Sequence, residues 1–218
     1  MTIPKPIPPV VASGRMSRTR QPHLALTGTM RLRPWQESDA PSLVRSCQDP
    51  DIQHWNRPGH LTADTAREKI ARWNRRWQDE EAAVWAITLT DSSTAAGLIA
   101  LADLDLAGGS AELVYWLLPA ARGRGAMTEA TRTVSRWAFD TLQLHRLRIT
   151  HSVANNASCT VATQAGFPLE GTMRSALLHA DGWHDEHLHA RVRTDLDLSP
   201  PPTALLRGRT DDGAASVA

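Results

Sequence analysis

The stretch that decides the fold is Arg122-Gly123-Arg124-Gly125-Ala126-Met127-Thr128-Glu129. The largely apolar residues 111–118 before it predict a strand, and apolar residues at helical spacing after it, over residues 127–138, predict a helix. The glycines allow tight turns that leave successive N–H groups unobstructed, and a helix start carries partial positive charge. The stretch therefore predicts a backbone cradle for a phosphate or pyrophosphate.

Two other phosphate-binding motifs do not fit this stretch. It contains no Gly-Lys-Ser/Thr sequence, so it is not a Walker A loop. A dinucleotide-binding fingerprint needs a third glycine where Thr128 stands, and the elements before the loop predict an antiparallel meander. The remaining alternative is a plain strand-to-helix turn with solvated arginines, and the loop alone does not decide between this turn and an anion site.

The sequence before the loop predicts alternating strands and two helices. Strands are expected at residues 29–35, 83–89, 97–106 and 111–118, and helices are expected from near Ser38 and from Thr62 or Asp64. In the second helix, apolar residues recur at helical spacing and form one face. The arginines between them are expected to form the solvated face. That apolar face consists of Ala66, Ile70, Trp73 and Trp77.

The sequence after the loop predicts a strand at residues 145–151, a short helix at 158–164 and two closing strands, 171–179 and 183–192. Gly166 suits the C-cap of the short helix, because it has no Cβ. Asp181-Gly182 predicts a hairpin turn between the last two strands. This order predicts an α+β, or mixed α/β, domain in which a single sheet carries helices on its faces.

Composition excludes several classes of protein. The chain has 218 residues, of which 41% are hydrophobic and 22% charged, as in an ordinary globular domain. No apolar run reaches the roughly 20 residues that span a bilayer, and residues 1–20 lack the apolar region of a signal peptide. A net charge of +1 shows no nucleic-acid footprint over the whole chain. Two cysteines, Cys47 and Cys159, indicate reduced thiols in a cytoplasmic protein.

Both ends of the chain differ in composition from its middle. Residues 1–27 are rich in proline and basic residues, and residues 199–218 begin with Ser-Pro-Pro-Pro and continue with small and charged residues. Neither segment can bury enough apolar surface to offset the entropy lost on ordering. We therefore expect two disordered tails around a domain that spans residues 28–198.

The strongest motif evidence is a resemblance. Glu112-Leu-Val-Tyr-Trp-Leu-Leu-Pro119, followed by the glycine loop and Thr128-Glu129-Ala130, closely resembles the acetyl-CoA-binding segment of the Gcn5-related N-acetyltransferase (GNAT) superfamily. The match is best to the RimJ/RimL-like branch of ribosomal-protein N-terminal acetyltransferases. Further segments follow in the order and spacing of that branch: Leu144-His145-Arg146, Asn155-Asn156-Ala157-Ser158, Gly166-Phe167, Leu169-Glu170-Gly171, Asp181-Gly182 and His187-Leu188-His189-Ala190-Arg191.

The resemblance covers about residues 30–193 and implies an acyl-CoA N-acyltransferase fold: a mostly antiparallel, twisted sheet with one parallel, splayed strand pair. Acetyl-CoA would be the co-substrate, with its pantetheine arm between the splayed strands. The implied contacts are the backbone of Trp116, Leu117 and Leu118 for pantetheine; Arg122, Gly123, Arg124, Gly125, Ala126, Met127 and Thr128 for the pyrophosphate; Asn155 for the pantetheine arm; and Ser158 near the thioester sulfur. Met127 departs from the family pattern, which has a small residue there.

The family reaction is direct attack of an amine on the thioester, which needs a base for the ammonium and an acid for the leaving thiolate. Ser158 is the predicted acid, and a nucleophilic role for the adjacent Cys159 is not favoured. The branch has a catalytic Glu where this chain has Leu177. Glu112 is therefore the first candidate base, and the others are Asp103, Asp105, His145, His151 and His179.

The remaining predictions concern ligands and partners. The run from His184 to His189 places His187 and His189 on one face of a strand, but nothing in the sequence completes four ligands, so no metal is expected. Loop residues Trp55 and Trp183 either meet an acceptor or only pack. We expect a small-molecule or peptide amine acceptor, no membrane partner, and a monomer or homodimer.

Two rival functions stay open. In the first, an enzyme of the same fold takes an aminoacyl group from tRNA instead of an acetyl group from acetyl-CoA. The arginines of residues 67–76, with Arg207 and Arg209, would contact the phosphates of the tRNA. The second is a non-catalytic CoA-binding module, which the missing Glu would explain.

Overall fold

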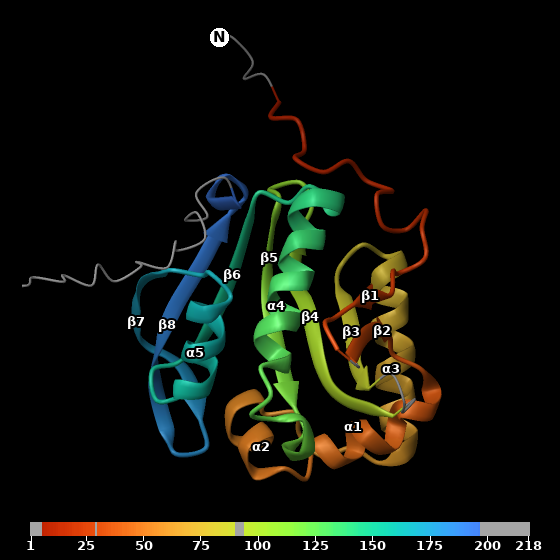
Figure 1. The fold of residues 1–218 in the computed structure, drawn as a ribbon, viewed down its shortest axis with the longest axis vertical. Helices are drawn as coiled ribbons and strands as arrows, with labels where there is room; N and C mark the ends of the chain where they lie inside the picture. Colours follow the sequence, from red (N-terminus) through yellow and green to blue (C-terminus); the bar gives the residue numbers. More distant parts are fainter. Residues whose placement is uncertain (1–5, 29, 90–93, 197–218) are drawn as a thin grey trace, which may run out of the picture.

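The computed structural model describes residues 6–28, 30–89 and 94–196, so the expected C-terminal tail lies outside the described residues. The described strands form one sheet in the order β1-β2-β3-β4-β5-β6-β8-β7 (Figure 1). The pairing of β5 with β6 is parallel and the other neighbouring pairs are antiparallel. The predicted mixed α/β fold with a single sheet is confirmed.

The strands are β1 (Leu24–Ala25), β2 (Met30–Pro34), β3 (Ala83–Leu89), β4 (Ala95–Asp105), β5 (Ser110–Leu117), β6 (Arg146–Ser152), β7 (Leu169–His179) and β8 (Gly182–Val192). The helices are α1 (Ala40–Ser46), α2 (Pro50–Asn56), α3 (Ala63–Gln78), α4 (Ala126–Trp137), which continues as a π-helical segment over Ala138–Leu142, and α5 (Asn156–Gln164). None of the described helices is both long and apolar enough to cross a membrane.

One helix, α2, was not predicted. It spans seven residues, which is too short for a periodic apolar pattern to stand out. Its start nevertheless has the expected chemistry, because the Asp49 side chain accepts a hydrogen bond from the backbone of Ile52 and Pro50 occupies the first turn. The helix ends at Arg57, whose φ of 49° is left-handed.

The parallel pair of strands separates along its length. β5 and β6 are paired at Ser110↔Arg146, Ala111↔Leu147 and Glu112↔Arg148, and the pairing ends there although both strands continue. The predicted splay is therefore confirmed. It leaves the residues of β5 after Glu112 without a strand partner on the side of β6.

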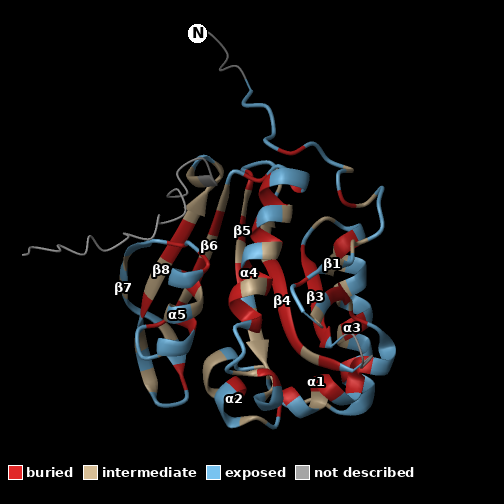
Figure 2. Cartoon of the chain, in the orientation of Figure 1, coloured by how far each residue is buried: buried red, intermediate tan, exposed pale blue. Residues whose placement is uncertain are grey.

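Each face of the sheet carries its own hydrophobic core. α4 and α5 lie over one face, where the core includes Trp85 and Ile87 of β3 (Figure 1). α1 and α3 pack on the opposite face, where Val84 and Ala86 of the same strand are buried. This is the alternation that the period-2 pattern predicts. Figure 2 shows the central strands buried over most of their length, while the helices expose their outer sides.

The expectation of a disordered tail over residues 1–27 is corrected for residues 10–27, which pack against the domain and are called the N-terminal strap here. Val11, Met16 and Leu26 are 4%, 1% and 8% exposed and belong to the core under α4. These three residues are widely spaced in the sequence, so they give no periodic signal. The strap also supplies β1, which pairs with β2.

The strap is anchored by hydrogen bonds to side chains of the domain. The Glu80 carboxylate accepts bonds from the backbone N–H groups of Gly14 and Met16, both at 2.7 Å. The indole N–H groups of Trp77 and Trp85 donate to strap carbonyls at 2.9 and 2.8 Å. The strap therefore satisfies buried polar groups of the core and covers its apolar surface.

Candidate active site

A cavity of about 1220 Å³ opens where β5 and β6 diverge. Most of the residues predicted for donor binding and catalysis line it: Glu112, Trp116, Leu117, Arg122, Gly123, Gly125, Ala126, Met127, Thr128, Asn155 and Ser158. Leu118 and Arg124 do not. The fold therefore gathers residues from β5, the loop before α4, and α5 around one space.

The glycine loop has the geometry of an anion cradle. Gly123 and Gly125 have φ values of 74° and 71°, in the left-handed region that glycine adopts without strain. A Cβ at either position would meet nothing within 4 Å, so the space above the loop is open. The first backbone bond of α4 runs from Glu129 N to Gly125 O at 3.1 Å. The N–H groups of residues 126–128 therefore have no intrahelical partner and are available to an anion.

Arg122 has a positioning role that the sequence did not suggest. Its guanidinium donates to Asp49 and Asp51, both at 2.6 Å, and its Nε donates to Leu117 O at 3.0 Å. Burial alone would raise the pKa of Asp49, but hydrogen bonds from the Ile52 backbone and Arg122 hold that pKa below its usual value. Arg122 therefore links the loop to both the end of β5 and the start of α2, and the residue lines the cavity.

The backbone of β5 beyond the splay is partly occupied. Leu118 N–H bonds to Ala96 O at 2.9 Å, so it faces β4 and is not available to a ligand. The Tyr115 carbonyl accepts a bond from Asn56 Nδ2 at 3.1 Å, and the Leu117 carbonyl accepts from Arg122. A ligand amide in the cleft would therefore meet the N–H groups on this edge of β5 rather than the Leu118 amide.

Ser158 lies at the start of α5, where Asn155 caps the helix by accepting the Ser158 N–H at 3.0 Å. The residue is 9% exposed, and its Oγ lies 2.9 Å from the hydroxyl of Tyr115. Burial raises the pKa of Tyr115 to about 12. The phenol therefore keeps its proton near neutral pH. Tyr115 stands in the quoted motif, but sequence reasoning gave its side chain no role.

Glu112, the first candidate base, is held by two neighbours. Its Oε1 accepts a hydrogen bond from Thr150 Oγ1 at 2.6 Å, and its Oε2 lies 3.0 Å from Arg148 Nε. These two bonds occupy both carboxylate oxygens and hold the side chain against β6. Glu112 lines the cavity, but its geometry is that of a residue fixing the sheet at the splay.

Glu186 on β8 is a carboxylate that sequence reasoning missed. It is 7% exposed and lines the cavity. Burial, with a smaller contribution from repulsion by Glu112, raises the pKa of Glu186, while the charge of Arg57 opposes the rise. A carboxyl with a raised pKa is a better proton acceptor near neutral pH. Sequence reasoning overlooked Glu186 because it lies within the run from His184 to His189. Alternate residues of that run face opposite sides of the sheet, so Glu186 is separated from its neighbours in the sequence.

The other candidate bases have different surroundings. His179 is 5% exposed, lines the cavity and donates from Nδ1 to His54 O at 2.9 Å, which leaves Nε2 as an acceptor without a partner among the described residues. His151 also lines the cavity. Asp103 pairs with Arg148 at 2.8 Å, Asp105 accepts a turn N–H from Gly108 at 2.8 Å, and His145 is exposed, and these three do not line the cavity.

One end of the cavity is built by α2 and the β7–β8 hairpin. Trp55 and Leu177 line it, the second at the position where the branch has its Glu. Trp183 is 64% exposed on the hairpin and does not line the cavity. Of the two predicted loop tryptophans, the structure thus brings Trp55 alone to the site.

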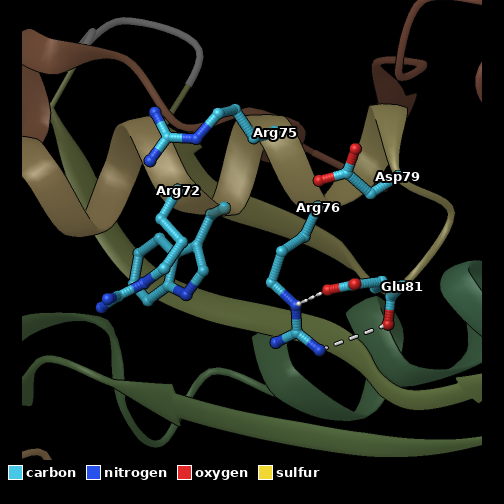
Figure 3. Close-up of a pocket in the computed structure, with 6 residues that line it drawn as sticks. Arg72, Arg75, Arg76, Asp79 and Glu81 are labelled. Carbon is cyan, nitrogen blue, oxygen red and sulfur yellow. Dashed lines mark hydrogen bonds and ion pairs between the residues drawn. The ribbon is translucent and has the colours of Figure 1, made fainter.

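A second hollow of about 480 Å³ lies on the arginine-rich side of α3 (Figure 3). Arg72, Arg75 and Arg76 line it together with Asp79 and Glu81. Figure 3 shows Arg76 bonded to Glu81, and the Nε–Oε2 distance is 3.2 Å. Arg67, in the first turns of α3, pairs with Asp64 at 2.6 Å. Acidic neighbours therefore offset part of the positive charge that the tRNA-dependent alternative relies on.

Relatives of the chain are found by sequence. YdaF of Bacillus subtilis (strain 168), which carries the provisional name of a ribosomal N-acetyltransferase, is 36% identical over 126 residues, or 57% of this chain and 67% of YdaF. The ribosomal-protein-serine acetyltransferase of Escherichia coli (strain K12) is 30% identical over 96 residues, or 44% of this chain and 54% of that protein.

Solved structures share the fold. RimL, the ribosomal L7/L12 alpha-N-protein acetyltransferase solved in complex with coenzyme A, matches with a TM-score of 0.73 and 23% identity over 78% of this chain and 98% of RimL. The microcin C7 self-immunity acetyltransferase MccE, solved with acetyl-CoA and AMP, matches with a TM-score of 0.68 and 22% identity over 76% of this chain and 93% of MccE. The family model for the acetyltransferase (GNAT) domain matches residues 29–168. The chain therefore belongs to the GNAT family of acetyltransferases.

Proposed function

We propose that the protein transfers the acetyl group of acetyl-CoA to the primary amine of a peptide or protein N-terminus. The observation that carries this proposal is the cleft between β5 and β6, which ends at an open glycine loop and the N-terminus of α4. A thioester on a long amide-bearing arm with a diphosphate fits such a cleft, because strand amides and helix N–H groups occur along one path.

The loop fits the diphosphate without rearrangement of its side chains. Met127, the departure from the family pattern, packs into the core under α4 and is 5% exposed. It does not fill the space above Gly123 and Gly125, which is open. The free N–H groups at the start of α4 supply the donors, and Arg122 fixes the loop against β5 and α2.

The acid that protonates the leaving thiolate is proposed to be Ser158, with Tyr115 as its positioning residue. We infer that the protonated phenol of Tyr115 is the donor in its 2.9 Å contact with Ser158 Oγ, which would leave the serine proton free to point into the cavity. When the C–S bond breaks, the thiolate takes the Ser158 proton and the serine is reprotonated from Tyr115 or solvent. The second hydroxyl orients the serine O–H bond, whereas a serine without such a neighbour could rotate its proton away from the cavity.

The base is proposed to be Glu186 rather than Glu112. The acceptor amine must lose a proton before its nitrogen bonds to the thioester carbon, and Glu186 is buried, lines the cavity and has a raised pKa. Glu112 is already bonded to Thr150 and Arg148, and its negative charge raises the basicity of Glu186. The two carboxylates together also attract a cationic amine to this side of the sheet.

A peptide N-terminus suits the shape and chemistry of the acceptor end. The space between α2 and the β7–β8 hairpin is bordered by Trp55, Arg57 and Leu177, which offer apolar and polar contacts to an extended chain. Relatives named as ribosomal-protein acetyltransferases point to the same class of acceptor. We infer that a ribosomal protein N-terminus is the acceptor to test first.

The test is turnover of acetyl-CoA with matched acceptors, measured by thiol release and by the mass of the product. The acceptors are N-terminal peptides of ribosomal proteins, the same peptides with blocked N-termini, a polyamine and an aminoglycoside. The proposal expects turnover with the free peptides and none with the blocked ones. Tight CoA binding without turnover on any amine would instead favour a CoA-binding module, and activity that disappears after RNase treatment would favour a tRNA-linked donor.

A further inference from the structure

Four potential metal ligands that are distant in the sequence meet under α5. His151 of β6, His187 and His189 of β8, and Cys159 of α5 each offer one ligand atom, and these atoms all lie within 4.8 Å of one another. The sheet register brings the histidines together, because His151 pairs directly with His187 and Ile149 pairs with His189. Cys159 comes from the helix that covers this face, and its Sγ lies 4.0 Å from His189 Nε2.

The imidazoles are oriented as metal ligands are. His189 donates from Nδ1 to Phe167 O at 3.0 Å, and His151 donates from Nδ1 to Ser152 O at 2.8 Å. Each of these bonds places the proton on Nδ1 and leaves the Nε2 lone pair free, which is the arrangement that backbone carbonyls impose on zinc-binding histidines. His151 and His189 are 6% and 2% exposed.

Two of the ring nitrogens in the cluster lack the partner that buried polar atoms normally have. Within the described residues, His151 Nε2 and His187 Nδ1 are buried and accept or donate no hydrogen bond. Leaving a buried polar atom unpaired costs about 1–3 kcal/mol, so such atoms point to a missing ligand. Both histidines belong to the group whose ligand atoms lie close together.

We propose that these four residues bind a divalent zinc-type ion. Three imidazoles and one thiolate are a tetrahedral N₃S set, which suits Zn²⁺ by ligand softness and by geometry. Zinc bond lengths place tetrahedral ligands about 3.5 Å apart, so closure needs side-chain movements of roughly 1 Å. Binding converts the Cys159 thiol to a thiolate and releases its proton to solvent.

The site would be structural rather than catalytic. With four protein ligands it has no open position for a water or a substrate. The ion would join α5 to β6 and β8, and Cys159 follows Ser158 directly in α5. Metal binding therefore fixes the helix that carries the proposed acid, without taking part in acetyl transfer. The sequence predicted no metal because His151 and Cys159 lie far from the histidine run along the chain.

The test uses the full chain without a histidine tag, kept reduced and loaded with Zn²⁺ or Co²⁺. Metal content by mass spectrometry should be one equivalent in the wild type and in Cys47→Ser, a variant of the buried cysteine outside the cluster. It should fall at least tenfold in Cys159→Ser and His189→Gln. Wild-type protein that retains no zinc, or zinc retained equally by Cys159→Ser, overturns the proposal.

Cobalt gives a second measurement that does not depend on a variant folding. Co²⁺ in a tetrahedral site with a thiolate has intense visible bands and a thiolate-to-metal charge-transfer band. We expect both in the wild type, and weak octahedral bands alone would contradict the site. Zinc should also raise the melting temperature of the wild type and of His145→Gln, whose parent histidine is exposed, but leave that of Cys159→Ser unchanged.

Discussion

The hydroxyl of Tyr115 lies 2.9 Å from Oγ of Ser158, and the two residues come from β5 and α5, on the two sides of the cleft. Tyr115 keeps its proton because burial raises its pKa to about 12. With Tyr115 as the proposed donor, this pair would fix the direction of the serine proton, and the first prediction tests it.

Ser158→Ala should lower kcat by about 100-fold and Tyr115→Phe by about tenfold, with smaller changes in KM, because general acid catalysis contributes factors of this order. The double variant should be no slower than Ser158→Ala, since Tyr115 acts through the serine. Steady-state kinetics at saturating acetyl-CoA measure this. Multiplicative losses in the double variant would show that the two hydroxyls act independently.

Glu186→Gln should remove the acidic limb of the pH–rate profile and lower kcat/KM by about 100-fold. In the wild type that limb should lie above the usual pKa of a glutamate, because burial and Glu112 raise the pKa of Glu186. Glu68→Gln, on the exposed side of α3, should leave the profile unchanged. An unaltered acidic limb in Glu186→Gln would assign the base elsewhere, with His179 as the next residue to test.

The same substitution should increase stability. A carboxyl whose folded pKa is raised binds more protons in the folded state, so its contribution is full at low pH and is lost as pH rises through the folded pKa. Glu186→Gln removes this loss, and we expect a higher melting temperature at neutral pH than in the wild type, with the difference vanishing in acid. Thermal unfolding at several pH values measures it.

Gly125→Trp should abolish acetyl-CoA binding, because the indole would occupy the open space above the loop. Any side chain at a left-handed glycine also strains the backbone, so the matched control is Gly59→Trp, whose parent has a φ of 73° and does not line the cavity. Calorimetry should show wild-type affinity in the control only. Arg122→Ala should weaken binding less sharply, since its side chain positions the loop through Asp49 and Leu117.

Glu80→Gln should loosen the N-terminal strap. Backbone N–H groups of Gly14, Met16 and Ser17 hold the pKa of Glu80 below its usual value, although burial opposes them. Its contribution is therefore present above the unfolded pKa and lost as pH falls through the folded one. We expect a loss of about 1 kcal/mol at neutral pH, reduced by partial exposure, and faster hydrogen exchange in the strap.

Much of the fold could be predicted because its signals are local. β3 has the predicted bounds, and its period of two places Trp85 and Ile87 in one core and Val84 and Ala86 in the other. The strap was not predicted, because Val11 and Met16 gain their burial from contacts with distant segments. A short polar or proline-rich segment becomes ordered when such contacts exist, and composition cannot show them.

Some residues of the candidate site could be predicted from local motifs, and others could not. The glycine loop and Ser158 lie in contiguous motifs, and both line the cavity. Tyr115 and Glu186 gain their chemistry from burial and from neighbours on other strands, so their pKa shifts had no sequence signal. Arg122 was assigned to the anion alone, since its partners on α2 belong to a helix that the sequence did not reveal.

The divergence of β5 from β6 leaves the sheet with two additional edges in its interior. An unpaired strand edge can pair with a strand of another chain and cause aggregation. Most proteins prevent this by covering the edge or by placing charged residues on it. Here the carbonyls of Tyr115 and Leu117 are covered by Asn56 and Arg122, and residues 149–152 of β6 line the cavity. Under the proposed donor binding, the amides of the pantetheine arm would pair with the open edge of β5, so the protein is expected to aggregate less with its donor bound than without it.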